Sequence, residues 1–372
     1  MPTRFKSISV RDTNLIKGWA ILLIVFHNYF HLIYRVTKEN EMDFDAGRFS
    51  ALITHTLFNP TEWVQGFFTY FGHFGVQLFI FLSAYGVTMA YSDIRGERLE
   101  FFFSRLKKIY PAFLLAIGAW LALYLLLDVL QDRKSTAEVL RIFQLRLFDV
   151  SKVIFGVHNF FPGHHYPVVG PWWFIPFIVQ FYLLWALFGG RLSACSRRAL
   201  MGLGMAGIAF NYLAVPFAEA KFRINLLYSP LGHIPEIVLG IYWAKYGVVL
   251  SRKFVLCSFV IFIGSSLSLS VWPLHHITAL VLMLWLAGAV LSCQSGSMER
   301  FLYYLGAYSM PLFLVNGFLR APFLKLSRHF DVWFVDILMA ITFFIVAFMA
   351  AVILKMAEVR LVRLISIRKS AS

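Results

Sequence analysis

The sequence predicts an all-α fold, a polytopic membrane bundle of about ten transmembrane helices with both termini in the cytoplasm. The 372 residues are 59% hydrophobic and only 14% charged, and the mean hydropathy is +0.71, values that no ordinary soluble domain has. Apolar runs recur along the whole chain, each near the roughly 20 residues that a helix needs to cross the hydrocarbon core. These runs do not alternate as transmembrane β-strands do, so a β-barrel is excluded.

The predicted spans follow these apolar runs in order. They are 13–34, 75–92, 109–130, 172–190, 199–218, 230–248, 254–272, 276–294, 302–320 and 333–355. No linker or repeat divides the chain, so residues 1–372 are expected to form one integral membrane domain with a basic cytoplasmic tail at about 356–372. Two external loops, roughly 35–62 and 131–171, are large enough to contribute to a site.

Lys and Arg gather in alternate connections and in the tail, which orients the chain with those segments in the cytoplasm. The net charge of +15 is therefore mostly a topology signal, and it is too dispersed for a nucleic-acid-binding face. The polar first residues, followed by an apolar run without a cleavage site, indicate no cleavable signal peptide. We expect a multi-pass protein of the plasma membrane (in bacteria, the inner membrane).

The first span carries two ionisable residues, Lys17 near its cytoplasmic start and His27 near mid-membrane. At 1.5 Å rise per residue they lie about 15 Å apart along the helix, roughly half the hydrocarbon thickness. Ionisable groups inside a bilayer are costly and tend to mark function. Lys17 and His27 therefore suggest a site reached from both sides of the membrane.

Six segments place polar groups or glycines where a plain membrane helix has none. They are Lys17 to His31, 75–86 (GVQLFIFLSAYG), 105–111 (RLKKIYP), 170–182 (GPWWFIPFIVQFY), 235–240 (PEIVLG) and 305–316 (LGAYSMPLFLVN). In this order they resemble the acyltransferase-3 family of integral membrane acyltransferases, which modify sugars of surface and exported glycans. The resemblance covers the chain from Ile16 to about Asn316. Each segment alone matches weakly, whereas six in the same order are specific.

Three positions depart from the family pattern. The family leaves ten residues between the basic residue and the His, whereas nine separate Lys17 from His27, and Asn28 occupies the usual His position. Ala84 stands for a Gly in the second segment, which exchanges one small residue for another. Asn316 stands for a His in the last segment, so proton transfer at that position is not expected.

The resemblance implies transfer of an acyl group, most simply acetyl, from cytosolic acyl-CoA to a sugar hydroxyl. It implies His27 as the base and Glu236 as a second catalytic residue, with no bound cofactor besides the acetyl-CoA (or other acyl-CoA) donor substrate. The polyanionic donor calls for cations at the cytoplasmic mouth. Those expected to bind the donor are Lys17, Arg105, Lys107 and Lys108, and those expected to bind the acceptor are Trp172, Trp173, Tyr182, Asn28, Ser83 and Asn316.

Each assignment has a structural alternative. Lys17 can snorkel to headgroups, and the cations near Arg105 can be positive-inside anchors. The tryptophans can belong to an interfacial belt, Asn316 can join helices, and His27 or His31 can be interior histidines. Glu236 can orient His27, bind substrate or pair with a basic residue.

No metal site is expected. The external His158, His164 and His165 have no carboxylate or Cys at ligand spacing, and Cys195, Cys257 and Cys293 form no CxxC pair. The expected partners are an acyl-CoA donor, a glycan or lipid-linked sugar acceptor and the lipid bilayer, with a second copy of the chain left open; nucleic acid is not expected.

Other acyl-transfer and nucleotide-binding signatures are absent. No His is followed four residues later by an Asp as in glycerolipid acyltransferases, and no nucleophile elbow or nucleotide fingerprint is present. Two rival functions remain. One is a glycan flippase or exporter, although paired discontinuous helices are not evident. The weaker one is a polysaccharide polymerase using external basic residues such as Arg141 and Arg146.

Overall fold

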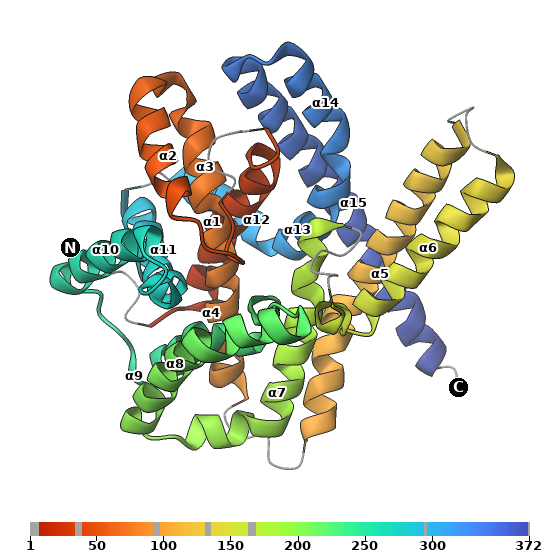
Figure 1. Cartoon of the computed structure of the whole chain (residues 1–372). Coiled ribbons are helices and arrows are strands. Elements are labelled where there is room, and N and C mark those ends of the chain that lie inside the picture. Colours follow the sequence, from red (N-terminus) through yellow and green to blue (C-terminus); the bar gives the residue numbers. More distant parts are fainter. Residues whose placement is uncertain are drawn as a thin grey trace.

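The computed structural model describes residues 7–33, 39–91, 97–130, 135–162, 169–293 and 296–370. These residues form helices and no β-strand, which confirms the predicted all-α class (Figure 1). The α-helices are α1 (Val10–Phe30), α2 (Ala46–Phe58), α3 (Trp63–Phe71), α4 (Gly75–Ala90), α5 (Arg98–Leu130), α6 (Thr136–Ile154), α7 (Phe174–Ala194), α8 (Arg197–Phe222), α9 (Ile234–Tyr246), α10 (Arg252–Leu267), α11 (His275–Cys293), α12 (Gly296–Ala307), α13 (Ser309–Leu319), α14 (Ala321–Phe330) and α15 (Trp333–Ser370). Short 3-10 helices are η1 (Pro60–Glu62), η2 (Gly72–Phe74), η3 (His158–Phe160), η4 (Gly170–Trp173), η5 (Leu226–Tyr228), η6 (Pro230–His233) and η7 (Trp272–Leu274).

Six stretches of the described chain are long and apolar enough to cross a membrane, or seven if one bent helix pair counts as a span. Two of the remaining predicted spans correspond to α9 and α10, which have only 13 and 16 residues. The first predicted span corresponds to α1, which is long enough but carries Lys17, His27 and Asn28. The multi-pass class is thus supported, whereas the count of ten and the cytoplasmic termini stay predictions.

Helix α1 lies at the centre of the bundle. A reciprocal capping box starts it, in which Ser9 accepts from the Asp12 backbone and Asp12 accepts from the Ser9 backbone. Its buried side chains join both hydrophobic clusters of the core, with Ile21 and Val25 in one and Leu15 and Leu23 in the other. A helix with buried apolar side chains on several sides belongs inside a bundle, which is where this one lies.

Glycines bring the neighbouring helices close to α1. A Cβ at Gly306 of α12 would lie 1.8 Å from the Asn14 carbonyl oxygen, and one at Gly18 would lie 1.9 Å from that of Leu302. On another side, a Cβ at Gly75 of α4 would lie 2.4 Å from the Ala20 carbonyl oxygen. Small residues allow this backbone approach in membrane bundles. The polar residues of α1 are therefore held at fixed positions against α4 and α12.

The external loops and the tail are more helical than predicted. Helices α2 and α3 fill the segment after α1, and α6 pairs with α5 in a hairpin that projects from the bundle (Figure 1). Helix α5 begins at Arg98, well before residue 109, where the predicted span starts. The basic turns between these two positions are helical, although they are too polar to lie in the hydrocarbon core. The predicted tail at about 356–372 begins as a continuation of α15, which extends to Ser370.

The predicted span 302–320 corresponds to two helices joined at a bend. Helices α12 and α13 meet at an angle of 77°, with Tyr308 between them. Pro311 lies in the first turn of α13, where its missing N–H and its ring prevent the helical hydrogen bonds of α12 from continuing. The break turns α13 toward the end of α1.

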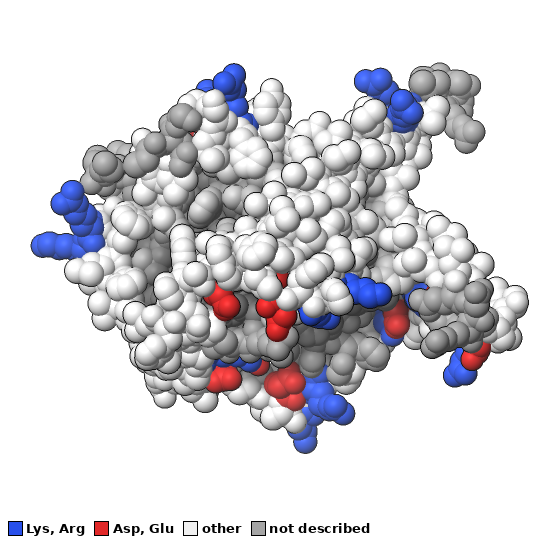
Figure 2. Space-filling view, turned by 90° about the horizontal axis from the view of Figure 1, so that it is seen from above, with Lys and Arg blue, Asp and Glu red and all other residues white. Residues whose placement is uncertain are grey.

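Seen from above, the molecule presents a mostly uncharged face (Figure 2). The Lys and Arg side chains visible there lie mainly at the edges, and the visible Asp and Glu side chains lie near basic ones. No dense basic patch is visible among the described residues on this face.

Candidate functional site

A cavity of about 420 Å³ opens beside the C-terminal end of α1. Its wall combines that helix end with η2, the segment before α2, η4 and the region around the end of α13. The lining residues are Ile24, His27, Asn28, His31, Leu32, Asn40, Glu41, Met42, His73, Val76, Gly170, Pro171, Trp173, Phe313 and Arg320. Most of the lining comes from segments that the predicted topology places in the outer half of the membrane or outside it.

His27 faces this cavity with one ring nitrogen fixed. Its Nδ1 lies 3.2 Å from the carbonyl oxygen of Phe68, and because a carbonyl only accepts, Nδ1 is the protonated nitrogen. The neutral ring then keeps its lone pair on Nε2. The side chain is only 8% exposed and packs 4.9 Å from the His31 ring and 5.3 Å from the His73 ring. His27 thus presents an imidazole of fixed orientation at the wall of the cavity.

A row of buried polar side chains lies along α3, η2 and α4 and passes the His27 ring at His73. Thr69, His73 and Gln77 are spaced four residues apart, so they share one helical face. The Thr69 hydroxyl, both His73 ring nitrogens and both Gln77 amide atoms have no hydrogen-bond partner among the described residues. Buried polar atoms without partners are costly unless water or a ligand satisfies them. This row marks a polar path beside α1, on the side toward Lys17.

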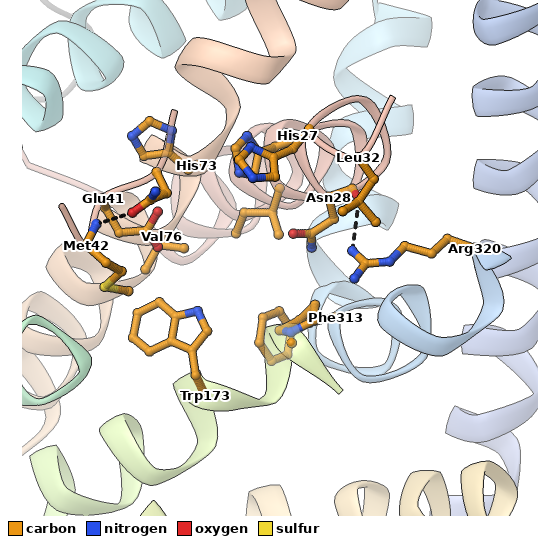
Figure 3. A pocket seen from close by; sticks show the side chains of 15 residues that line it. His27, Asn28, Leu32, Glu41, Met42, His73, Val76, Trp173, Phe313 and Arg320 are labelled. Atoms are coloured by element: carbon orange, nitrogen blue, oxygen red, sulfur yellow. Dashed lines mark hydrogen bonds between the residues drawn. The ribbon is translucent and has the colours of Figure 1, made fainter. Parts of the chain in front are cut away.

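Asn28 and Asn316 are brought together, as a shared site requires. Asn28 Nδ2 donates to Asn316 Oδ1 at 2.8 Å, and Asn316 Nδ2 donates to the Leu312 and Phe313 carbonyls. Arg320 lies at the cavity wall, and its Nη1 donates to the Asn28 carbonyl at 2.8 Å (Figure 3). The Asn pair therefore joins α1 to α13, and a separate contact to the Asn28 backbone holds the Arg320 cation at the cavity wall.

The two adjacent tryptophans, Trp172 and Trp173, have different surroundings. Trp173 lines the cavity across from His27 (Figure 3). Trp172 is fully buried behind the wall, where its Nε1 donates to the Leu314 carbonyl at 2.9 Å and its ring packs on Trp120. Only Trp173 is placed to meet a molecule in the cavity.

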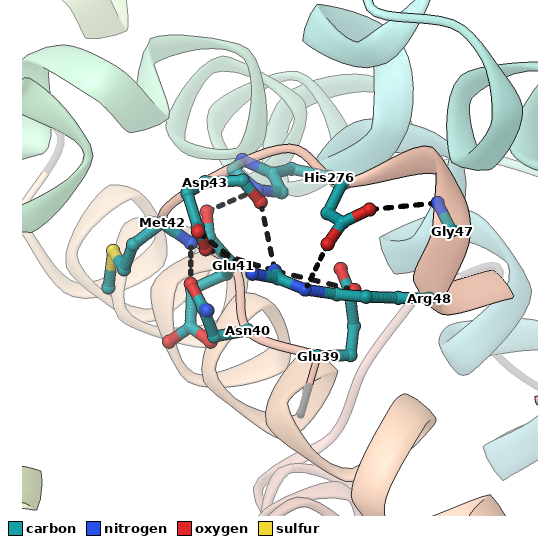
Figure 4. A network of polar contacts seen from close by, with 9 residues as sticks. Glu39, Asn40, Glu41, Met42, Asp43, Gly47, Arg48 and His276 are labelled. Atoms are coloured by element: carbon teal, nitrogen blue, oxygen red, sulfur yellow. Dashed lines mark hydrogen bonds and ion pairs between the residues drawn. The ribbon is translucent and has the colours of Figure 1, made fainter. Parts of the chain in front are cut away.

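The segment between α1 and α2 forms an acidic rim (Figure 4). Arg48 holds it by a bidentate pair to Asp43 at 3.0 and 2.9 Å and by a longer contact to Glu39. Burial raises the pKa of Glu39 to about 8, partly offset by Arg48. Burial also raises the pKa of Glu41, which lines the cavity, to about 7, offset by a backbone hydrogen bond and by His233. Glu41 can thus exchange a proton near neutral pH.

A second group of residues lies at the other end of α1. Arg105 stacks over the ring of Tyr91 at 4.5 Å and over that of Tyr182 at 5.7 Å, and its Nε has no hydrogen-bond partner among the described residues. Lys17 is close enough to Arg105 for the two charges to interact. Tyr182, expected near the acceptor, belongs to this group instead. Lys107 and Lys108 are exposed on α5.

Glu236 and Ser83 lie outside the cavity lining. Glu236 is 1% exposed, and its Oε1 is 3.1 Å from His233 Nδ1 and 3.7 Å from His276 Nδ1. Glu236 was predicted to orient His27, to bind substrate or to pair with a basic residue. Its described contacts match the last alternative, and the partners are His233 and His276. Ser83 is half-buried on α4, between the cavity and the C-terminal end of that helix.

Three ionisable residues of the cavity were not predicted as site residues from the sequence: His73, Glu41 and Arg320. His73 stands two residues before the 75–86 segment, and Arg320 stands four residues after Asn316, hence on the same helical side. Both were detectable as ionisable residues next to a motif. Glu41 gave no such signal, because its position depends on how the segment before α2 folds back. His164 and His165 lie outside the described residues, and His158 is buried in η3.

Comparison with family models matches residues 10–357 to the acyltransferase-3 family, described as an acyltransferase domain. The match spans nearly the whole chain and includes the cavity, the group around Arg105 and the bent α12–α13 pair. Searches of curated proteins and of solved structures give no significant match. The chain therefore belongs to the acyltransferase-3 family and is a membrane acyltransferase.

Proposed function

We propose that the protein is an O-acyltransferase of the plasma membrane that transfers an acyl group, most simply acetyl, from cytosolic acyl-CoA to a sugar hydroxyl of a surface or exported glycan. The observation that carries this proposal is the hydrogen bond from His27 Nδ1 to the Phe68 carbonyl. It leaves Nε2 as a base in a cavity large enough for a sugar ring. A hydroxyl needs such a base because it is a weak nucleophile at neutral pH.

In the proposed reaction, Nε2 of His27 takes the proton of the acceptor hydroxyl while its oxygen attacks the thioester carbonyl carbon. The carbonyl oxygen becomes an oxyanion, and the Arg320 guanidinium is the cation in the cavity that can stabilise it. Collapse of the tetrahedral intermediate breaks the carbon–sulfur bond, and the imidazolium returns its proton to the departing CoA thiolate. The products are an O-acyl sugar and CoA, with His27 regenerated.

The donor is proposed to enter from the cytoplasm beside Lys17 and Arg105. The two cations have no acid among their described hydrogen-bond and ion-pair partners, and Arg105 lies over three aromatic rings. Clustered cations beside aromatic faces suit the phosphates and adenine ring of CoA. The pantetheine arm would then follow the row of Thr69, His73 and Gln77, whose unpartnered polar atoms suit its amides.

Replacing Arg105 by Gln is expected to raise the KM for acyl-CoA roughly tenfold or more, because a hydrogen bond to a charged group contributes about 1.5–3 kcal/mol. Steady-state kinetics of the purified protein with radiolabelled acetyl-CoA measures this. Arg98→Gln, an exposed position on the same helix, is the control and should leave the KM unchanged. Equal effects of the two variants would remove Arg105 from the donor site.

Replacing Trp173 by Ala is expected to raise the KM for the glycan acceptor roughly 2- to 10-fold, since an aromatic face contributes about 0.5–1.5 kcal/mol beyond its buried area. The KM for acyl-CoA should stay constant, which a general loss of folding would not produce. Trp63→Ala, at an exposed position of α3, is the control. An acceptor KM that does not change in Trp173→Ala would place the sugar elsewhere.

A glycan exporter remains the second candidate because of one observation, the discontinuous α12–α13 pair. Broken helices line the binding sites of many transporters. An exporter would move the glycan without changing it, so its cavity residues would affect the amount exported and not the acetyl content per sugar.

A further inference from the structure

We propose that His233, Glu236 and His276 form a binding site for one divalent transition-metal ion of the zinc type, separate from the acyl-transfer cavity. The three side chains come from η6, α9 and α11, and all are buried. One ligand atom from each lies within 4.8 Å of the other two. Two imidazoles with one carboxylate are a ligand set that zinc uses in proteins.

The outward-facing nitrogen of each imidazole fixes its tautomer. His233 Nε2 lies 2.9 Å from the Leu227 carbonyl oxygen, and His276 Nε2 lies 2.9 Å from the Glu41 carbonyl oxygen. Carbonyls accept only, so both Nε2 atoms are donors. Metal-bound histidines almost always donate their second ring N–H in this way, often to a backbone carbonyl. In the neutral rings, both Nδ1 lone pairs then face Glu236.

The inner atoms converge on a single point. Glu236 Oε1 is 3.1 Å from His233 Nδ1 and 3.7 Å from His276 Nδ1. Ligands at about 2.0–2.1 Å from a tetrahedral zinc ion lie roughly 3.3 Å from one another. Without a metal ion, a proton on His233 Nδ1 would satisfy its 3.1 Å contact with Glu236. The 3.7 Å contact between Glu236 and His276 Nδ1 would remain too long for a hydrogen bond. A cation at the centre satisfies all three atoms.

One further atom favours a bound ion over a simple pair. Glu236 Oε2 is buried and has no hydrogen-bond partner among the described residues, an expensive state for a carboxylate. Of the three ligand residues, only His276 lines the neighbouring cavity of about 10 Å³, which has room for about one water molecule. A zinc ion held by three protein ligands takes its fourth ligand from water or another small molecule.

The proposed ion would fix the rim of the acyl-transfer cavity. His276 donates to the backbone of Glu41, whose side chain lines that cavity. The ion would join α9 and α11 to the segment before α2, so its effect would be on stability and on the rim, not on the proton transfer at His27. The inference therefore stands independently of the acyl-transfer proposal.

The test measures metal in the purified full-length protein in detergent, with any affinity tag removed, after zinc loading and dialysis against a weak chelator. Inductively coupled plasma mass spectrometry should find about one zinc ion per chain. Glu236→Gln and His276→Gln should each lower zinc affinity by more than the roughly 10- to 100-fold typical of changes outside the ligand set. Cobalt loading should give visible d–d absorption bands in the wild type and not in the variants.

His275→Gln is the matched control. His275 is the neighbouring buried residue, but its Nδ1 faces the Ser265 hydroxyl and its ring stacks on Phe262. This variant should retain the zinc. A zinc content at background level and no cobalt bands in the wild type would overturn the proposal and leave an imidazolium–carboxylate pair. This result does not depend on whether any variant folds. Zinc retained in Glu236→Gln and His276→Gln would also overturn it.

Discussion

His27→Asn is expected to abolish acyl transfer while the protein stays folded. The Asn side chain can still donate a hydrogen bond to the Phe68 carbonyl, but it offers no basic nitrogen to the cavity. General-base catalysis contributes typically about 10²- to 10⁴-fold, so the rate should fall by that factor. Proton NMR of surface glycan before and after mild base, from cells with matched expression, measures the base-labile acetyl groups.

Three outcomes separate the functions. Acetyl signals that vanish in His27→Asn, with unchanged glycan quantity, support O-acyl transfer dependent on His27. Equal acetyl signals in both strains would remove His27 from the mechanism. Less exported glycan with unaltered acetyl content per sugar would replace the transferase proposal by the exporter.

Gly72→Ala is expected to have the second largest effect, on both activity and stability. The added Cβ would lie 2.6 Å from the His27 Cβ and 2.7 Å from the Leu23 carbonyl oxygen, so α1 and η2 must separate. Overpacking of this kind costs about 1–3 kcal/mol. A shift of about 1 Å in a catalytic group can reduce the rate about 100-fold. Thermal unfolding in detergent and the transfer assay measure the two effects.

Gly86→Ala, in helix α4, is the matched control. A Cβ at Gly86 meets no atom within 4 Å, and alanine favours a helix by about 1 kcal/mol over glycine. The control should therefore leave activity unchanged and keep or raise the unfolding temperature. Normal activity and unfolding temperature in Gly72→Ala would show that the close approach at His27 is not required.

Composition and apolar runs predicted the fold class, and several boundaries as well. Helix α4 begins at Gly75, where the predicted span starts, and α11 begins one residue before its span. Hydropathy identified only apolar runs long enough to cross a membrane, so α6 and α14, which are more polar, and α2, which has only 13 residues, were missed. The bend between α12 and α13 was also missed, because both halves are apolar and the angle depends on packing.

The site was predictable where one helix carries the information. His27 and Asn28 follow from the polar residues of α1, and Trp173 from its motif. The sequence could not separate Trp173 from Trp172, since a 3-10 helix directs adjacent side chains to different sides. The pairing of His233 with Glu236 had a signal in their spacing of three residues. His276 had none, because only the packing of α11 near α9 brings it there.

The central position of α1 has a consequence for biogenesis. Helix α1 packs most closely against α12, and the contact of Gly306 with Asn14 can form only after nearly 300 further residues have been made. Until then Lys17, His27 and Asn28 lack their final surroundings, a costly state for polar groups in lipid. Contacts so distant in sequence form slowly. The helix that carries His27 is thus made long before its surroundings are complete, and a truncated or stalled product would contain His27 without the bundle that orients it.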